Sequence, residues 1–166
     1  EQKKLLYKKA RNRLITFDGL KVAVLGLTFK PGTDDLREAP SLDNVPLLLE
    51  QGADIYAFDP VGVYNFAKVY PEGKQGKGSI TYVGNPEEAL RDANVCFVFT
   101  EWGDVKAVQP ETYRKLMRTP LVFDGRNIYN VDEMMQAGVE YHSVGRRSAE
   151  RVRAKELSEN DLQKAR

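Results

Sequence analysis

Short apolar runs alternate along this chain with stretches of helical spacing, and this alternation restricts the fold more than any other feature. Residues 21–25 (KVAVL) and 54–58 (DIYAF) have the length and side chains of buried strands. Further strands are predicted at 80–83, 94–99, 120–123 and 139–144, and helices at 2–16, 41–50, 61–69, 85–91, 110–117 and 130–137. Strands that alternate with helices form a parallel sheet with helices on both faces. Because such crossovers are right-handed, the sequence predicts an α/β fold with a doubly wound, Rossmann-like parallel sheet.

The predicted helix over 41–50 carries three local signals. Ser41 is the expected N-cap, and Gly52 follows the last helical residue. Pro46 lies inside the helix and predicts a kink or a later start.

Composition restricts the class of protein. A chain of 166 residues favours one compact domain, and no internal repeat is visible. Lys+Arg 25 against Asp+Glu 24 argues against a dedicated nucleic-acid binder. No apolar run approaches the length of a membrane span, no signal peptide opens the chain, and a single cysteine suits a reducing compartment. We therefore expect a cytoplasmic protein that binds neither nucleic acid nor membrane. It starts at Glu1 in the middle of a predicted helix, so we also expect a fragment of a longer protein.

The first predicted strand is followed by an unusual loop, GLTFKPGTDDLREAPS, over residues 26–41. The spaced glycines of a dinucleotide fingerprint are missing from it. Lys30 can neutralise a phosphate as a point charge, and Arg37 can hold one with two hydrogen bonds. Thr33 and the two aspartates after it can bind ribose hydroxyls or hold the loop against these cations. A surface loop with internal salt bridges is the alternative, but structureless loops of ~14 residues are usually functional.

Two further loops follow predicted strands. Trp102, after the strand at 94–99, either stacks on a base or sugar or covers the sheet edge, and the sequence favours neither. Gly125 is predicted to turn the backbone sharply and to place Arg126 over the strand ends. Because ligands bind at the carboxyl ends of strands in such sheets, Arg126 and Lys30 are predicted to converge on one anion.

Four other features do not indicate a site. Residues 73–79 (GKQGKGS) lack the spacing of a phosphate-binding loop and are predicted to be a flexible turn. Asp59, before a proline, indicates a turn that ends a strand rather than a ribose-binding acid. Cys96 lies in an apolar run and is predicted to be a core residue. His142 is the only histidine, so a zinc site of the usual kind is not expected.

Several motifs occur in a fixed order along the chain. They are GLTFKPGTDDLREAPS, FDP at 58–60, TEW at 100–102, FDGRNIY at 123–129 and VGR at 144–146. Together they closely resemble the C-terminal, UDP-binding domain of the UDP-glucose 6-dehydrogenase family, whose wider group includes GDP-mannose and UDP-N-acetylhexosamine dehydrogenases. The TEW and DGRN motifs look most like the UDP-glucose branch.

The resemblance implies roles for individual residues. Phe29 and Lys30 are expected to contact the UDP-sugar, and so is Arg126. Arg37 is expected to face the NAD side of the cleft between this domain and an N-terminal NAD-binding domain. No residue of this chain matches a catalytic residue of the family, and Cys96 does not match the family's nucleophile.

The resemblance also implies an organisation. Residues 1–18 are expected to be the end of the inter-domain linking helix, and 19–146 the UDP-sugar-binding domain. The charged tail over 147–166 is predicted to be a loose helix or disordered, and no function is assigned to it. The parent protein is expected to be a homo-oligomeric, NAD-dependent UDP-glucose 6-dehydrogenase with NAD bound mainly by the N-terminal domain. The fragment alone is expected to be inactive.

Two alternatives remain open. The chain is the same domain of another nucleotide-sugar dehydrogenase, acting on a UDP-N-acetylhexosamine or GDP-mannose. Alternatively, it is a stand-alone, non-catalytic binding module.

Overall fold

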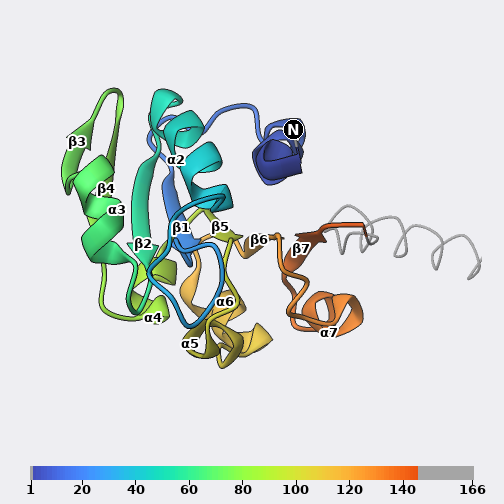
Figure 1. Ribbon diagram of the computed structural model, residues 1–166. Coiled ribbons are helices and arrows are strands. Elements are labelled where there is room, and N and C mark those ends of the chain that lie inside the picture. Colours follow the sequence, from blue (N-terminus) through green and yellow to red (C-terminus); the bar gives the residue numbers. More distant parts are fainter. Residues whose placement is uncertain (1, 146–166) are drawn as a thin grey trace, which may run out of the picture.

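Within residues 2–145, which the computed structural model describes, seven strands form one sheet in the order β3-β4-β2-β1-β5-β6-β7 (Figure 1). The strands are β1 (Lys21–Leu25), β2 (Asp54–Phe58), β3 (Gly73–Gln75), β4 (Gly78–Tyr82), β5 (Val95–Val98), β6 (Leu121–Asp124) and β7 (Glu140–Ser143). Every neighbouring pair is parallel except β3 and β4, which are antiparallel. The charged tail over 147–166, for which the sequence predicts a loose helix or disorder, lies outside the described residues.

Helices connect the strands. They are the short 3-10 helix η1 (Gln2–Lys4), α1 (Leu5–Arg13), α2 (Pro40–Glu50), α3 (Val63–Val69), α4 (Pro86–Leu90), α5 (Gly103–Lys106), α6 (Pro110–Leu116) and α7 (Val131–Gln136). In the described part of the chain, none of them has both the length and the apolar character that crossing a bilayer requires.

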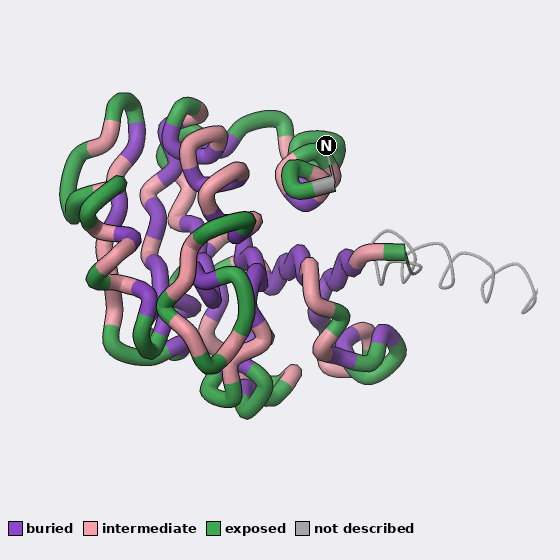
Figure 2. The backbone as a smooth tube through the Cα atoms, viewed as in Figure 1, coloured by how far each residue is buried: buried purple, intermediate pink, exposed green. Residues whose placement is uncertain are grey.

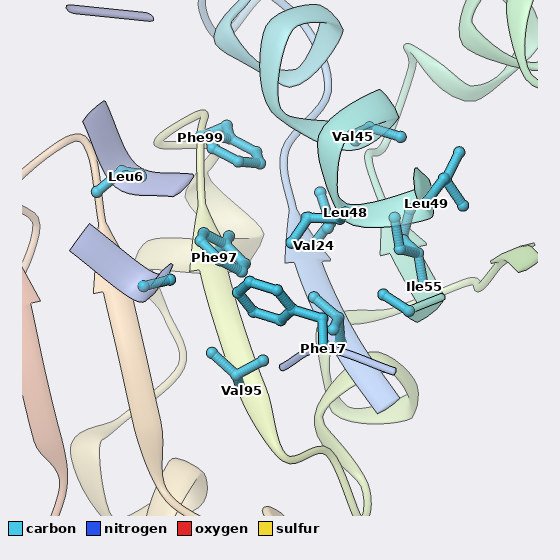
Figure 3. Close-up of a cluster of buried hydrophobic side chains, with 14 of the residues drawn as sticks. Leu6, Phe17, Val24, Val45, Leu48, Leu49, Ile55, Val95, Phe97 and Phe99 are labelled. Carbon is cyan, nitrogen blue, oxygen red and sulfur yellow. The ribbon is translucent and has the colours of Figure 1, made fainter. Parts of the chain in front are cut away.

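Alternate residues of the central strands face two separate apolar layers, as the period of a strand dictates. On one face, Val24 and Phe97 pack with α1, α2 and α3 (Figure 3). The Phe97 ring lies 6.3 Å from the ring of Phe17, centroid to centroid. On the other face, Leu25 and Cys96 pack with α4, α5, α6 and α7. The central strands β1, β5 and β6 are therefore almost entirely buried, whereas the edge strand β3 is largely exposed (Figure 2), and the predicted doubly wound α/β fold is confirmed.

The strand order reverses beside β1. The chain moves from β1 to β2 and β4 on one side, and then returns to place β5 on the other side of β1. In open α/β sheets, the crevice at such a switch point lies at the carboxyl ends of the strands and is where ligands bind. The loops after β1 and β5 therefore flank the expected binding position.

Two predictions about helix ends were wrong. The helix predicted over 2–16 ends at Arg13, because Leu14 is in an extended conformation; after it, Thr16 Oγ1 accepts a hydrogen bond from the Asp18 amide (3.0 Å). Ser41 does not cap α2, which begins at Pro40. Its hydroxyl is buried and donates to the Leu27 carbonyl oxygen at 2.6 Å.

The segment predicted to be a flexible turn over 73–79 is a hairpin. Strand β3 pairs with β4 from Gly73 opposite Ile80 to Gln75 opposite Gly78. The polar, glycine-rich composition concealed this strand, because an edge strand is solvated and needs no apolar alternation. The sheet is consequently mixed rather than fully parallel.

Candidate functional site

The loop between β1 and α2, light blue in Figure 1, has as its third residue a buried threonine, Thr28, whose polar atoms all make hydrogen bonds. The Thr28 amide donates to Asp59 Oδ2 (3.2 Å), and its carbonyl oxygen accepts from Thr100 Oγ1 (2.6 Å). The Thr28 hydroxyl donates to the Lys30 carbonyl oxygen at 3.1 Å. The chain is thus fixed at the residue that immediately precedes Phe29 and Lys30.

Phe29 and Lys30 follow this anchor on the outside of the molecule. Phe29 keeps 41% of its surface exposed. Lys30 is exposed, and its ammonium group has no ion-pair partner among the described residues. An exposed apolar ring beside an unpaired cation fits a ligand that has both a flat face and a negative charge.

Arg37 lies further along the same loop and is held by its own neighbour. Its Nη2 lies 2.9 Å from Asp35 Oδ2, and the Arg37 side chain remains 88% exposed. The hydrogen bonds from Arg37 lower the pKa of Asp35 to about 2. This is the internal salt bridge that the sequence allowed as an alternative for the loop. Together with Asn65 of α3, the stretch forms an open hollow of about 490 Å³, lined by Thr33, Asp34, Asp35, Leu36, Arg37 and Asn65.

Asp59, directly after β2, is buried and joins three loops. Its Oδ1 accepts from the amides of Val61 (2.9 Å) and Gly62 (2.7 Å), so the predicted turn at the end of the strand is confirmed. Its Oδ2 accepts from the amide of Leu27 at 2.7 Å and from the indole Nε1 of Trp102 at 2.9 Å. The carboxylate therefore ties the loop after β2 to the loops after β1 and β5.

The indole of Trp102 makes a second hydrogen bond inside the domain. Its Nε1 also lies 3.2 Å from Thr28 Oγ1, and the ring packs half-buried against the second apolar layer. These contacts agree with the prediction that Trp102 covers the sheet edge, and stacking on a base or sugar stays a prediction.

Asp124, the last residue of β6, organises the neighbouring loop in a similar way. Its carboxylate is buried and accepts from the amides of Arg126 (2.7 Å) and Asn127 (3.0 Å) and from the hydroxyl of Tyr141 (2.6 Å). The left-handed residue of this turn is Asn127 (φ 56) and not Gly125, which corrects the predicted role of the glycine. A Cβ at Gly125 would lie 3.0 Å from the end of the Leu6 side chain, so the glycine allows close packing there.

Arg126 projects from this loop and meets Glu101 of the loop after β5. Nε lies 3.1 Å from Oε2, and Nη2 lies 3.0 Å from Oε1. Burial raises the pKa of Glu101, but the hydrogen bonds from Arg126 and from its own backbone, together with the charges of Arg126 and Lys106, bring it below its ordinary value. Arg126 and Lys30 both lie just beyond the carboxyl ends of strands, and their convergence on one anion remains a prediction.

The single cysteine and the single histidine of the chain are both buried. Cys96 is completely buried, and burial with the nearby Asp124 charge raises the pKa of its thiol well above the usual value. His142 stacks on Phe123 at 4.8 Å between ring centroids, and its Nε2 lies 2.9 Å from Glu140 Oε2. Within residues 2–145, His, Cys, Asp and Glu side chains form no group of three or more that could hold a metal ion.

Sequence reasoning missed the residues that hold the site in shape. Thr28, Asp59 and Thr100 were not predicted to meet. Their motif positions, GLT, FDP and TEW, were the available signal, because each lies at the end of a strand.

Comparison with known proteins gives an independent result. Residues 23–131 match the model of the UDP-glucose/GDP-mannose dehydrogenase family, UDP binding domain. A curated relative is the UDP-glucose 6-dehydrogenase YwqF of Bacillus subtilis (strain 168), 44% identical over 147 residues that cover 89% of this chain and 32% of the relative. The chain spans about a third of the length of the curated relatives that it matches.

Two solved structures are similar. A UDP-glucose dehydrogenase from Pyrobaculum islandicum gives a TM-score of 0.66 at 30% identity, covering 85% of this chain and 29% of that one. An NDP-N-acetyl-D-galactosaminuronic acid dehydrogenase from Methanosarcina mazei Go1 gives 0.64 at 26% identity, covering 89% of this chain and 29% of that one.

Proposed function

This chain belongs to the UDP-glucose/GDP-mannose dehydrogenase family, within its UDP binding domain, and from that premise we propose that it holds the nucleotide part of UDP-glucose for an NAD-dependent UDP-glucose 6-dehydrogenase. The substrate would lie at the carboxyl edge of the sheet, beside the switch point between β1 and β5. The parent enzyme would oxidise the sugar in the cytoplasm as a homo-oligomer.

One observation carries this proposal. A buried, fully hydrogen-bonded Thr28 is followed directly by an exposed Phe29 and by Lys30, whose ammonium group has no ion-pair partner within residues 2–145. A rigid anchor next to free recognition groups lowers the entropy lost when a ligand binds. In our proposal the ring of Phe29 and the ammonium of Lys30 contact the UDP-sugar, and Arg126 supplies a second cation.

NAD would be bound mainly by the part of the parent enzyme that this chain does not include. The loop after β1 lacks the spaced glycines that allow a pyrophosphate to approach the backbone. Arg37 is the residue that we assign to the NAD side, and its guanidinium is exposed and available once Asp35 releases or shares it. When bound, NAD would accept the hydride from the sugar alcohol, while this chain orients the nucleotide.

We also propose a second candidate substrate class, because a protein of similar fold is named for a different sugar. The Methanosarcina mazei structure is described as a dehydrogenase for an NDP-N-acetyl sugar acid, at 26% identity. The identity to UDP-glucose 6-dehydrogenases is higher, 44% for YwqF, and this difference favours UDP-glucose.

Steady-state kinetics of the full-length parent enzyme test the proposal. NADH formation should be fastest with UDP-glucose and much slower with UDP-N-acetylglucosamine or GDP-mannose. Lys30→Gln should raise KM for UDP-glucose about tenfold, because a charge-assisted hydrogen bond is lost, and leave KM for NAD nearly unchanged. Equal KM values for wild type and Lys30→Gln would remove Lys30 from the substrate site.

A further inference from the structure

We propose that Asp59 is a positioning residue for the sugar nucleotide, which it does not touch itself. It sets the backbone that presents Phe29 and Lys30, and Trp102 assists it from the loop after β5. This inference rests on the proposed function, because it concerns the same substrate and the same loop.

The surroundings of Asp59 are unusual for an acid at the end of a strand. The side chain is buried, with 5% of its surface exposed, yet its hydrogen-bond partners in the described part of the chain are N–H and O–H groups and include no cation. Several N–H donors directed at one carboxylate compensate for its lost hydration. Closing the turn after β2 requires only Oδ1, which leaves Oδ2 to serve the loop after β1.

The Oδ2 atom acts on the backbone next to the recognition groups. It accepts from the amides of Leu27 (2.7 Å) and Thr28 (3.2 Å) and from the Trp102 indole (2.9 Å). Thr28 in turn restrains the backbone of Lys30, because its hydroxyl donates to the Lys30 carbonyl oxygen at 3.1 Å. Two hydrogen-bonded steps therefore separate the Asp59 carboxylate from the Lys30 backbone.

Close packing adds to the hydrogen bonds. A Cβ at Gly62, in the turn that Asp59 closes, would lie 2.6 Å from the methyl group of Thr28. The turn after β2 therefore lies directly against the anchor of the loop after β1. A shift of either segment displaces the other, since interiors packed to this density do not absorb such a shift locally.

The substitution Asp59→Asn tests the hydrogen-bonded role with little change in volume. An amide has one accepting oxygen and one donating nitrogen, whereas the carboxylate accepts at both positions. In either orientation, the side-chain amide introduced by this substitution turns an NH₂ group toward amide donors, at the Leu27 side or at the Gly62 side. Positioning of Phe29 and Lys30 should loosen as a result.

The experiment compares variants of the full-length parent enzyme by calorimetric titration with UDP-glucose and with NAD. We expect Asp59→Asn to weaken UDP-glucose binding about tenfold, since misplacement by about 1 Å has large effects on bound-state geometry. NAD binding should change less than about twofold. KM for UDP-glucose should rise with the dissociation constant.

The matched control is Glu140→Gln. Glu140 is also a buried acid with several hydrogen bonds, but it is the first residue of β7 and thus lies at the opposite edge of the sheet from the substrate loops. This variant should lose thermal stability and keep its UDP-glucose affinity. If Asp59→Asn behaves in the same way, folded and with unchanged affinity, the positioning role is wrong.

Two further variants separate the possible failures. If Asp59→Asn does not fold, Trp102→Phe serves instead, because it removes one donor to Asp59 Oδ2. We then expect a loss of about threefold in UDP-glucose affinity, and unchanged affinity would overturn the inference.

Lys30→Gln reports on the proposed function itself. Weak binding by Lys30→Gln with normal binding by Asp59→Asn refutes the positioning role alone, whereas normal binding by Lys30→Gln refutes the substrate contact on which it rests.

Discussion

The guanidinium of Arg126 meets the carboxylate of Glu101 at two points, with Nε 3.1 Å from Oε2 and Nη2 3.0 Å from Oε1. Each side chain is 29% exposed, so the pair is partly shielded but open to solvent. A two-point contact fixes the plane of the guanidinium as well as its position. Arg126 is therefore oriented by Glu101, and within residues 2–145 its other guanidinium donors have no hydrogen-bond partner.

The substitution Arg126→Lys tests whether this orientation serves the substrate. Lysine keeps the charge but cannot form two parallel hydrogen bonds to an oxyanion. The loss of a charge-assisted hydrogen bond of about 1.5–3 kcal/mol predicts a tenfold to hundredfold weaker UDP-glucose affinity. Calorimetric titration of UDP-glucose and NAD into the full-length parent enzyme measures this, and the NAD affinity should change much less.

Normal UDP-glucose affinity in the Arg126→Lys variant would leave Arg126 with a structural role only. If the variant melts at a lower temperature but binds UDP-glucose normally, the contact with Glu101 only supports the loop. Arg126 would then be removed from the substrate site.

Glu140 should make the stability of the domain sensitive to acid. Burial raises the pKa of this carboxyl, but the hydrogen bonds from His142 and Arg13 outweigh burial and bring the pKa to about 2, below its ordinary value of 4.5. A carboxyl with a lowered folded-state pKa stabilises the fold above its unfolded pKa, and this contribution disappears as the pH falls from about 4.5 to about 2. The free energy of unfolding should therefore decrease across this window.

Urea denaturation of wild type and Glu140→Gln at a series of pH values checks this expectation. At pH 6 the variant should be less stable by about 2 kcal/mol, because hydrogen bonds to a charged group are lost. The two proteins should approach equal stability near the acid end of the window. A difference that does not depend on pH would assign the effect to packing instead.

Cys96 is expected to be structural. Its thiol is completely buried, and burial raises its pKa, so little thiolate is present at neutral pH. Cys96→Ala should lower the free energy of unfolding by about 1 kcal/mol and leave UDP-glucose binding unchanged. Rapid reaction of the native thiol with a thiol reagent at neutral pH would show that the burial is wrong.

The isolated chain of 166 residues is expected to have no dehydrogenase activity. It lacks a glycine-rich NAD fingerprint, and its one thiol is buried in the sheet. NADH absorbance in the presence of UDP-glucose and NAD measures the activity. Turnover that survives rigorous purification and is abolished by Cys96→Ser would contradict this assignment.

The sequence predicted the sheet because its central strands are buried on both faces and therefore read as continuous apolar runs, such as residues 21–25 and 95–98. It also predicted the long loop after the first strand, which has no helix or strand between Leu25 and Pro40. The hairpin of β3 and β4 was missed, because its pairing depends on a neighbour in the sheet and not on its own side chains.

The internal contacts of the site could not be predicted from local patterns. The bond from the Trp102 indole to Asp59 joins residues 43 positions apart, and the bond from Thr100 to Thr28 joins residues 72 apart. Spacing along the chain gives no signal for such pairs. Sequence reasoning could place each residue at the end of a strand, but not determine which partner each one meets.

Hydrogen–deuterium exchange of the full-length parent enzyme, with and without UDP-glucose, tests the central claim most directly. Exchange reports local opening of the backbone, so a bound ligand slows it where the loops are held. We predict protection of peptides that cover residues 26–38 and 124–129, and unchanged exchange in the hairpin over 73–79. Unchanged exchange in both loops at saturating UDP-glucose, or protection confined to the hairpin, would contradict a nucleotide-sugar site at the carboxyl edge of this sheet.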